Sequence, residues 1–227
     1  MKKPIVLFGT GKIAEVILYY AEQECGFQVD AFVVDQAYVG RGEWKGKPVY
    51  ALENLHEHIR PETHDAFVAI GYHNMNQVRA QKVEALQNLG FTLVSILPAS
   101  ANAPKDLTIG FNCFIMPPAI LHPCVTIGND VFIWSGAMVA HHSSIQDHCW
   151  ITSTANIGGN CQIGEHSFLA LNTTVSHGIT IGKKCFLGAN TLVTKNMEDG
   201  QVVIAESAKP IRLNSTQFLK FSSFSNL

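Results

Sequence analysis

The most regular feature of the chain is an aliphatic residue at every sixth position over much of its second half. Fifteen consecutive positions in this frame hold Ile, Leu or Val. They are Ile109, Ile115, Leu121, Ile127, Ile133, Val139, Ile145, Ile151, Ile157, Ile163, Leu169, Val175, Ile181, Leu187 and Val193. A period of six fits neither an α-helix nor a lone strand. It is typical of a parallel β-helix of hexapeptide repeats, in which each hexad forms one side of a triangular coil.

The residues around each aliphatic position support this interpretation. Four residues later the side chain is mostly small or medium-sized, as at Cys113 and Ala137, which predicts that it fills an interior corner. Gly often follows the aliphatic residue directly, and we expect it to permit the tight bend there. The frame from Ile109 to Glu198 predicts five uninterrupted coils of three hexads each.

The cysteines fit the same frame. The chain has six, and four of them are separated by multiples of six residues. These four are Cys113, Cys149, Cys161 and Cys185. No pair has C-x-x-C spacing, which disfavours a zinc knuckle. We expect Cys113, Cys149 and Cys185 to be interior corner residues stacked in one column.

The N-terminal part alternates short apolar runs with helical patterns. Predicted strands cover residues 4–8, 31–34, 65–70 and 92–97, and predicted helices cover 12–24 and 76–89. This alternation predicts a small parallel sheet with helices on its faces. We therefore expect an α/β domain at 1–96, a β-helix at 97–212 and a C-terminal tail at 213–227.

Two glycines after the first predicted strand form a candidate phosphate-binding turn. Gly9-x-Gly11-x-x-Ala14 fits the dinucleotide fingerprint, and Asp35 follows 24 residues after Gly11. Such glycines let the backbone approach a phosphate, and the helix N-terminus presents free N–H groups. Only about 95 residues precede the repeat, so we expect half of a Rossmann fold and a mononucleotide ligand rather than NAD. A tight turn with no ligand is the alternative.

Composition excludes several classes of protein. Charged residues make up 15% of the chain, but no window reaches the ~18 uninterrupted apolar residues of a spanning helix. The apolar run at residues 4–8 ends too early for a signal peptide. Lys and Arg number 16 against 18 Asp and Glu, which disfavours a nucleic-acid partner. We expect a cytoplasmic protein with neither a membrane nor a nucleic acid as partner.

The α/β segment joined directly to hexads resembles the sugar O- and N-acyltransferases of the sialic acid O-acetyltransferase type, from Pro4 to about Arg212. This resemblance implies a half-Rossmann-like domain that binds a nucleotide sugar, followed by a left-handed β-helix that transfers an acyl group. The general crossover rule alone would predict the other hand. The resemblance also implies acetyl-coenzyme A as co-substrate, bound between the subunits of a homotrimer, and a nucleotide-linked amino sugar as acceptor.

The location of the few charges agrees with a trimer. Residues 109–198 carry seven charged side chains and no Arg, whereas the other 137 residues carry 27 charged side chains. Flat sides buried against two partner subunits would require such uncharged faces.

By the same resemblance, His141 matches the catalytic base. An imidazole titrates near pH 6.5 and can accept a proton from an attacking amine or hydroxyl at neutral pH. The next residue is often acidic in this family and is credited with orienting the base, but here it is His142. Asp147 or a backbone carbonyl is a candidate for that role, and His142 as the base is an alternative. One coil further, Gly159 would offer its N–H to the thioester oxygen.

The resemblance also implies the ligand contacts. Ala170 and Gly188 match small residues beside the cofactor, and Lys209 is a candidate for meeting a coenzyme A phosphate. The candidate contacts to the nucleotide sugar are Gly9, Gly11, Lys12, Asp35, Gly71, His73 and Asn74. The segment around Tyr72, His73 and Asn74, followed by Asn76 and Arg79, is similar to a strand-end loop of the family.

Other functions of the same fold compete with this interpretation. A zinc carbonic anhydrase would need three histidines; His141 and His177 lie two coils apart, but the third position is Gly182. His148 and His166 stack one coil apart without a third partner, so we expect no metal. Sugar O-acetylation and a non-enzymatic, trimeric nucleotide-sugar-binding scaffold are further alternatives.

The tail has a short apolar periodicity of its own. Phe218, Phe221 and Phe224 recur at steps of three, which predicts a helical face packed on a neighbour.

Overall fold

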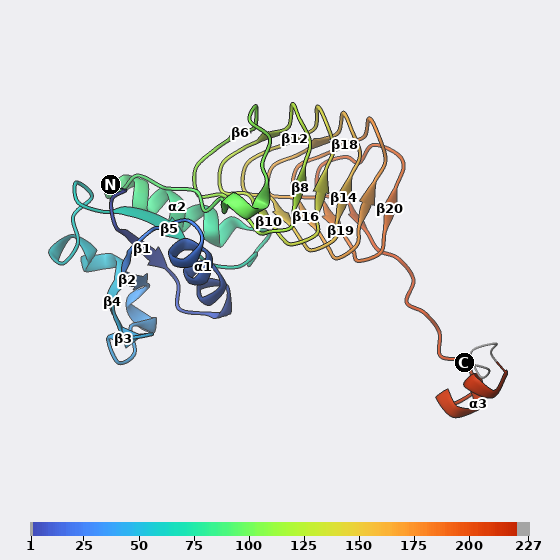
Figure 1. Cartoon of the computed structure of the whole chain (residues 1–227), viewed down its shortest axis with the longest axis horizontal. Coiled ribbons are helices and arrows are strands. Elements are labelled where there is room, and N and C mark those ends of the chain that lie inside the picture. The colour runs from blue at the N-terminus through green and yellow to red at the C-terminus, as the bar shows by residue number, and fades with distance from the viewer. Residues whose placement is uncertain (1, 222–227) are drawn as a thin grey trace.

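A computed structural model describes residues 2–221 and shows an α/β region that leads into a β-helix, followed by an extended tail (Figure 1). The N-terminal sheet has the order β3-β4-β2-β1-β5. Its strands are β1 (Ile5–Phe8), β2 (Val29–Val34), β3 (Glu43–Trp44), β4 (Lys47–Ala51) and β5 (Asp65–Val68). All pairs are parallel except β3 with β4. The predicted half-Rossmann-like fold is confirmed.

Two long helices cover opposite faces of this sheet. Alternate residues of β1 point to opposite sides: Ile5 packs in one apolar cluster with α1 (Lys12–Gln23), and Val6 packs in another with α2 (Gln77–Asn88). Three short 3₁₀ helices complete the region: Gln36–Tyr38, Leu52–Glu57 and Ala99–Ala101.

Two details of the N-terminal region differ from the prediction. Residues 92–97 form only isolated bridges, Ala66 with Leu93 and Ile96 with Phe114, because the chain leaves the sheet edge there and enters the first coil. The strands β3 and β4 were not predicted. The sequence of β4, which contains Pro48 and buries only Val49 and Ala51, lacks a continuous apolar run.

The repeat forms fifteen two-residue strands, β6 to β20, and each ends in one of the predicted aliphatic residues. They are β6 Thr108–Ile109, β7 Phe114–Ile115, β8 Ile120–Leu121, β9 Thr126–Ile127, β10 Phe132–Ile133, β11 Met138–Val139, β12 Ser144–Ile145, β13 Trp150–Ile151, β14 Asn156–Ile157, β15 Gln162–Ile163, β16 Phe168–Leu169, β17 Thr174–Val175, β18 Thr180–Ile181, β19 Phe186–Leu187 and β20 Leu192–Val193. Strands three apart in sequence pair in parallel and build three sheets, one of which is extended by β21 (Val202–Val203). The predicted left-handed β-helix is confirmed.

The bend at each corner of the coils is made by a residue other than the predicted glycine. The third residue after most aliphatic positions has a positive φ and is usually not glycine, as at Asn112 (54°) and Asp130 (55°). The glycines that directly follow the aliphatic residues do not have a positive φ. A Cβ on Gly158, for example, would lie 2.7 Å from the backbone N of His177. These glycines therefore let successive coils approach each other, and the expectation that they permit the bend is wrong.

The interior cysteines form part of the packed core. Cys113, Cys149 and Cys185 are fully buried and free. Burial raises the pKa of the Cys113 and Cys149 thiols to about 12. Their predicted role as interior corner residues is confirmed.

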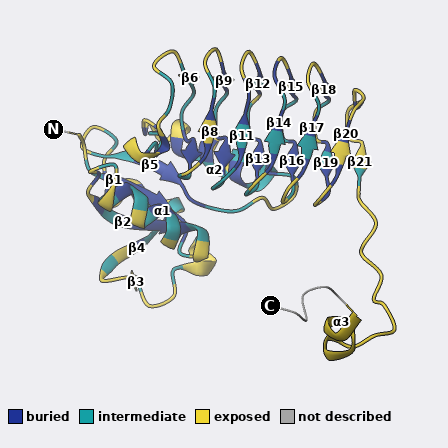
Figure 2. Ribbon diagram, turned by 45° about the vertical axis from the view of Figure 1, so that its right-hand side comes forward, coloured by how far each residue is buried: buried dark blue, intermediate teal, exposed yellow. Residues whose placement is uncertain are grey.

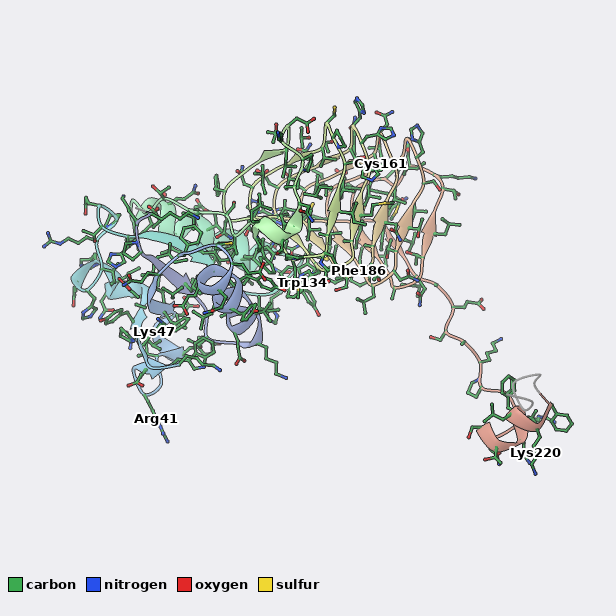
Figure 3. The ribbon with its side chains drawn as sticks, viewed as in Figure 1. Arg41, Lys47, Trp134, Cys161, Phe186 and Lys220 are labelled. Carbon is green, nitrogen blue, oxygen red and sulfur yellow. The ribbon has the colours of Figure 1, made fainter. Side chains whose placement is uncertain are left out.

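One side of the β-helix packs on the N-terminal region. Its outward side chains are aromatic, and Phe114, Phe132, Trp150 and Phe168 share one apolar cluster with β1 and α1. Trp134 borders this cluster, where the β-helix meets the N-terminal region (Figure 3). The two regions therefore share one apolar cluster, and both contain many buried residues, drawn dark blue in Figure 2.

From residue 204 to residue 221 the chain is exposed, and its last described element is α3 (Ser215–Phe221), which is drawn yellow in Figure 2. Phe218 and Phe221 of the predicted apolar face are exposed in the single chain, and Phe224 lies outside the described residues. None of the helices within residues 2–221 is long and apolar enough to cross a membrane.

Candidate active site

The corner between β11 and β12 holds the two histidines for which catalysis was predicted. Ala140 is buried, whereas His141 and His142 are exposed. His142 takes the left-handed corner conformation, with φ of 60°. The two Nδ1 atoms lie 3.1 Å apart and the rings are nearly perpendicular, at 84°.

At this distance one Nδ1 donates a hydrogen bond and the other accepts it. A neutral imidazole has one N–H donor and one acceptor nitrogen. When Nδ1 of His141 donates to Nδ1 of His142, Nε2 of His141 keeps its lone pair. His142 is therefore the side chain that contacts the predicted base. Asp147 does not contact His141, because its carboxylate accepts hydrogen bonds from the backbone N and Nδ2 of Asn129 at 2.8 and 3.2 Å.

Gly159 lies against the His141 ring on the next coil. A Cβ at position 159 would lie 2.8 Å from Cε1 and 3.0 Å from Nε2 of His141. The Gly159 carbonyl accepts a hydrogen bond from the N–H of Gly178 at 2.9 Å. Its own N–H donates to no group within the part of the chain that the structure describes. The corner therefore combines an imidazole with an uncommitted backbone donor.

A carboxylate on the same column of corners was missed by sequence reasoning. Asp106 accepts a hydrogen bond from the backbone N of Cys124 at 2.7 Å. This hydrogen bond is the main cause that lowers the pKa of Asp106, and the charge of His142 lowers it further. Residues 106, 124 and 142 follow one another at intervals of 18, the length of one coil. This spacing could have predicted that Asp106 lies in the same column of corners as His142.

The other histidines do not form a metal centre. His177 lies two coils from His141, with ring centroids 6.4 Å apart. His148 and His166 stack at 4.7 Å, as predicted. Among residues 2–221, no group of three His, Cys, Asp or Glu side chains could hold a metal ion.

The second candidate site is a cavity of about 710 Å³ at the carboxyl ends of β1, β2 and β5. Six of the seven residues predicted to contact the nucleotide sugar line it. They are Gly9, Gly11, Lys12, Asp35, Gly71 and His73. Asn74 does not line it; its Nδ2 donates to Oε1 of Gln77 at 2.7 Å, just before α2.

The glycines in this cavity have distinct structural causes. Gly9 has φ of 122°, and a Cβ there would lie 2.9 Å from the carbonyl oxygen of Ala69. Only glycine fits this turn between β1 and α1. Gly11 is the N-cap of α1, which has no side-chain cap, so the first N–H groups of the helix are available to an anion.

An ion pair at the cavity was not predicted. Nζ of Lys82 lies 2.5 Å from Oδ1 of Asp35, and both residues line the cavity. Tyr72 and Tyr38 line it too and are largely exposed. Lys82 belongs to α2, and nothing in the spacing between residues 35 and 82 indicates that α2 brings it to this cavity.

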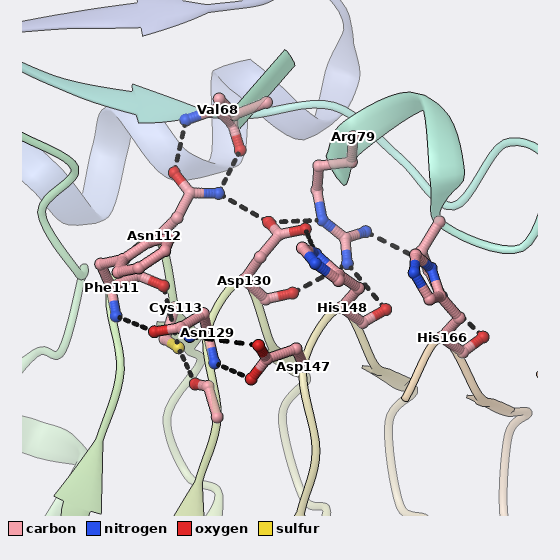
Figure 4. A network of polar contacts seen from close by, with 12 residues as sticks. Val68, Arg79, Phe111, Asn112, Cys113, Asn129, Asp130, Asp147, His148 and His166 are labelled. Carbon is pink, nitrogen blue, oxygen red and sulfur yellow. Dashed lines mark hydrogen bonds and ion pairs between the residues drawn. The ribbon is translucent and has the colours of Figure 1, made fainter. Parts of the chain in front are cut away.

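Asn76 and Arg79 lie apart from the cavity and are fully buried. Nε of Arg79 lies 2.8 Å from Oδ1 of Asp130, and Nη1 of Arg79 donates to Oδ1 of Asn76 at 3.0 Å. Oδ2 of Asp130 lies 2.9 Å from Nδ1 of His148 (Figure 4). These residues join α2 to the β-helix.

The residues predicted to bind the cofactor are divided between two corners. Gly159 follows β14, whereas Ala170 and Gly188 follow β16 and β19, which belong to a different sheet. Lys209 lies in the exposed segment between β21 and α3. A single chain therefore does not bring these four residues together.

The repeat matches two protein families. The bacterial transferase hexapeptide family (six repeats) matches residues 106–141, and the hexapeptide repeat of succinyl-transferase matches residues 155–195. With the α/β region in front of the repeat, these matches define a hexapeptide-repeat acyltransferase. A search of curated proteins finds no match.

Solved structures specify the type further. The acetyltransferase domain of PglB from Neisseria gonorrhoeae FA1090 is 25% identical, with a TM-score of 0.80 over 92% of this chain and 100% of that chain. A variant of GDP-perosamine N-acetyltransferase from Caulobacter crescentus in which a histidine is replaced by alanine, solved in complex with CoA and GDP-perosamine, has the same fold at 24% identity. It covers 90% of this chain and 95% of that chain, with a TM-score of 0.78. The chain therefore has the fold of these hexapeptide-repeat acetyltransferases over almost its whole length.

Proposed function

We propose that the protein transfers the acetyl group of acetyl-coenzyme A to the amino group of a nucleotide-linked sugar. The observation that carries this proposal is the corner at which the His141 imidazole lies on Gly159. The chain also has a separate cavity suited to a phosphate-bearing ligand. The solved structures with this fold include one that binds both CoA and GDP-perosamine.

The cavity of the N-terminal region has the chemistry of a nucleotide site. Its volume of about 710 Å³ is in the usual range for small-molecule sites. A diphosphate placed before α1 would meet the N–H groups of the first helical turn and the Lys12 ammonium, and Asp35 would accept from a hydroxyl. Lys82 limits the negative charge of Asp35 by pairing with it.

The proposed chemistry is direct acyl transfer. Nε2 of His141 takes a proton from the sugar amine as the amine nitrogen attacks the thioester carbonyl carbon. A C–N bond forms, the C–S bond breaks, and the leaving thiolate takes up the proton that His141 accepted, which restores the neutral imidazole. His142 accepts the Nδ1–H of His141 and so favours the tautomer with a free Nε2. The Gly159 N–H stabilises the oxyanion.

We further propose that the site is completed in a homotrimer. Gly159 and the pair Ala170 and Gly188 lie at different corners of one β-helix, so one acetyl-coenzyme A contacts both only if it lies between two copies. The sheet between these corners exposes Ile120 and Leu192, which are apolar side chains suited to a subunit interface.

The test is an acetyl-transfer assay with acetyl-coenzyme A and UDP-, dTDP- and GDP-linked amino sugars, in which the acylated product is identified by mass. His141→Ala should lower kcat by about 10²- to 10⁴-fold. His56→Ala, an exposed histidine on the 3₁₀ helix at residues 52–57, is the matched control and should retain the activity. The same assay is run with nucleotide sugars that carry a hydroxyl in place of the amino group. If only these hydroxyl compounds are acylated, the protein is an O-acetyltransferase. Full activity of both His141→Ala and His142→Ala would refute the catalytic assignment.

A further inference from the structure

Residues 8–82 supply the whole lining of the nucleotide cavity, yet one wall of this cavity is attached to the β-helix. This wall is the segment 69–73, which follows β5 and carries Gly71, Tyr72 and His73. Ala69 also lies against Gly9, since a Cβ on Gly9 would meet its carbonyl oxygen at 2.9 Å. The position of this wall therefore affects the phosphate-binding turn as well.

The first attachment is Asn112, at a corner of the first coil. β5 is an edge strand whose outer side pairs with residues 92–94 only as far as Ala66. Two residues later, the Asn112 side-chain amide pairs with the backbone of Val68. Its Oδ1 accepts from the N–H of Val68 at 2.7 Å, and its Nδ2 lies 3.4 Å from the Val68 carbonyl oxygen. A side chain of the β-helix thus replaces the next strand at the point where the cavity wall begins.

The Asn112 amide is itself held in place. Its Nδ2 donates to Oδ1 of Asp130 at 2.7 Å, and the same oxygen lies 2.8 Å from Nε of Arg79 (Figure 4). All three side chains are fully buried. The Arg79 guanidinium also lies over the ring of Phe132, at 4.5 Å from its centroid. A buried amide between fixed partners has one orientation, so it holds Val68 in one position.

Two further attachments hold the rest of the segment. The Tyr72 ring packs on Phe168 and Trp150, with centroids at 4.7 and 5.3 Å. The Met75 carbonyl lies 3.2 Å from Nδ1 of His166. The β-helix therefore contacts the chain just before this segment, at Val68, within it, at Tyr72, and just after it, at Met75.

We propose that Asn112 is a positioning residue for the nucleotide site, and that the β-helix sets the affinity of this site through the wall at residues 69–73. The inference rests on the proposed function only in that the cavity binds a nucleotide. Asn112 itself touches no ligand, because it does not line the cavity.

The test compares Asn112→Gly with Asn190→Gly. Both asparagines have a left-handed corner conformation, with φ of 54° and 59°, so glycine removes the side chain without straining the backbone. Within residues 2–221, Asn190 makes its hydrogen bonds to the neighbouring coil, with Asn172 and Leu171. Isothermal titration with UDP, dTDP and GDP should give a Kd raised about fivefold or more for Asn112→Gly, the effect of one lost buried hydrogen bond, and an unchanged Kd for Asn190→Gly.

A second pair of variants tests the attachment at Tyr72. Phe168→Leu removes the ring beneath Tyr72, whereas Phe186→Leu removes the next ring of the same stack, 5.0 Å further on. The nucleotide Kd should rise for Phe168→Leu and stay constant for Phe186→Leu. In the transfer assay, KM for the nucleotide sugar should rise and KM for acetyl-coenzyme A should not.

The outcomes separate the two proposals. If the wild-type protein binds none of the nucleotides, the proposed function of the cavity is wrong. If the wild type binds one of them and Asn112→Gly and Phe168→Leu bind it equally well, the positioning role is wrong. A lower Tm with an unchanged Kd would also overturn the proposal, because a merely structural role changes stability and leaves the affinity of the folded protein intact.

Discussion

Gly159→Ala is the sharpest test of the proposed catalytic corner, because its first consequence is steric and local. Position 159 does not have a positive φ, so alanine does not strain the backbone. Its Cβ, however, would lie 2.8 Å from Cε1 of His141. Carbon atoms pack at about 3.5–4.0 Å, so the imidazole must withdraw by about 0.7 Å or more. The ring is exposed and free to withdraw.

The expected result is a folded but slow enzyme. A displacement of about 1 Å in a catalytic group costs on the order of 10²-fold in rate, so kcat should fall by about that factor. Stability should change by less than about 0.5 kcal/mol, because only an exposed side chain moves. The measurements are the initial rate of coenzyme A release with a nucleotide amino sugar, and the Tm of both proteins.

A double-mutant cycle identifies the route of the effect. In the His141→Ala background the ring is absent, so Gly159→Ala should cost little more. An additional hundredfold loss in that background would show that alanine acts on the oxyanion donor or on the acyl chain instead. A wild-type rate for Gly159→Ala alone would refute the reasoning that the ring position observed here is the catalytic one.

The remaining predictions concern the buried network and the nucleotide cavity. Asp130→Ala leaves the fully buried Arg79 guanidinium without its counter-charge and should lower the free energy of unfolding in urea by about 3–5 kcal/mol; an exposed change such as Glu62→Ala, which should alter it little, is the control. Burial, and next the charge of His148, lowers the pKa of His166, so the native protein takes up this proton at a lower pH than the unfolded chain. The stability present above about pH 6.5 is therefore lost as pH falls through the lowered pKa, and His166→Gln should lessen this loss in unfolding curves at pH 5, 6 and 7. Lys82→Met removes the partner of Asp35 and should change the nucleotide Kd by about tenfold without changing KM for acetyl-coenzyme A; equal Kd values would show that the pair does not affect the ligand.

The strands of the β-helix could be predicted to the residue because one quantity, the number of residues per coil, determines which residues are neighbours in space. Residues 18 apart lie on adjacent coils, so the frame that predicted fifteen strands also predicts which corner residues meet. The contact between His141 and Gly159 follows this rule, as does the hydrogen bond from Asn112 to Asp130. The handedness does not follow from the period and came only from the resemblance.

The N-terminal region has no such rule, and there the predictions reached only the contiguous motifs. Gly9 and Gly11 were identified because one turn needs both within three residues. Lys82 was missed because its approach to Asp35 depends on how α2 packs on the sheet. Arg79 was grouped with a ligand-binding loop, since a sequence does not distinguish a buried arginine from one that faces a phosphate.

The glycines of the repeat show why a correct pattern still allowed a wrong cause. Both explanations, a bend and a close approach, predict glycine after the aliphatic residue. They differ in which residue takes the positive φ, and the structure assigns it to the third residue, as at His142 and Asp130. The bend is therefore open to polar side chains, and these are the side chains that carry the chemistry. Because the glycines make room between coils, the corner beside them can hold an imidazole against the backbone of the next coil, as His141 lies on Gly159. The same division of roles lets Asn112 and Asp130 reach out of the β-helix to Val68 and Arg79 of the N-terminal region.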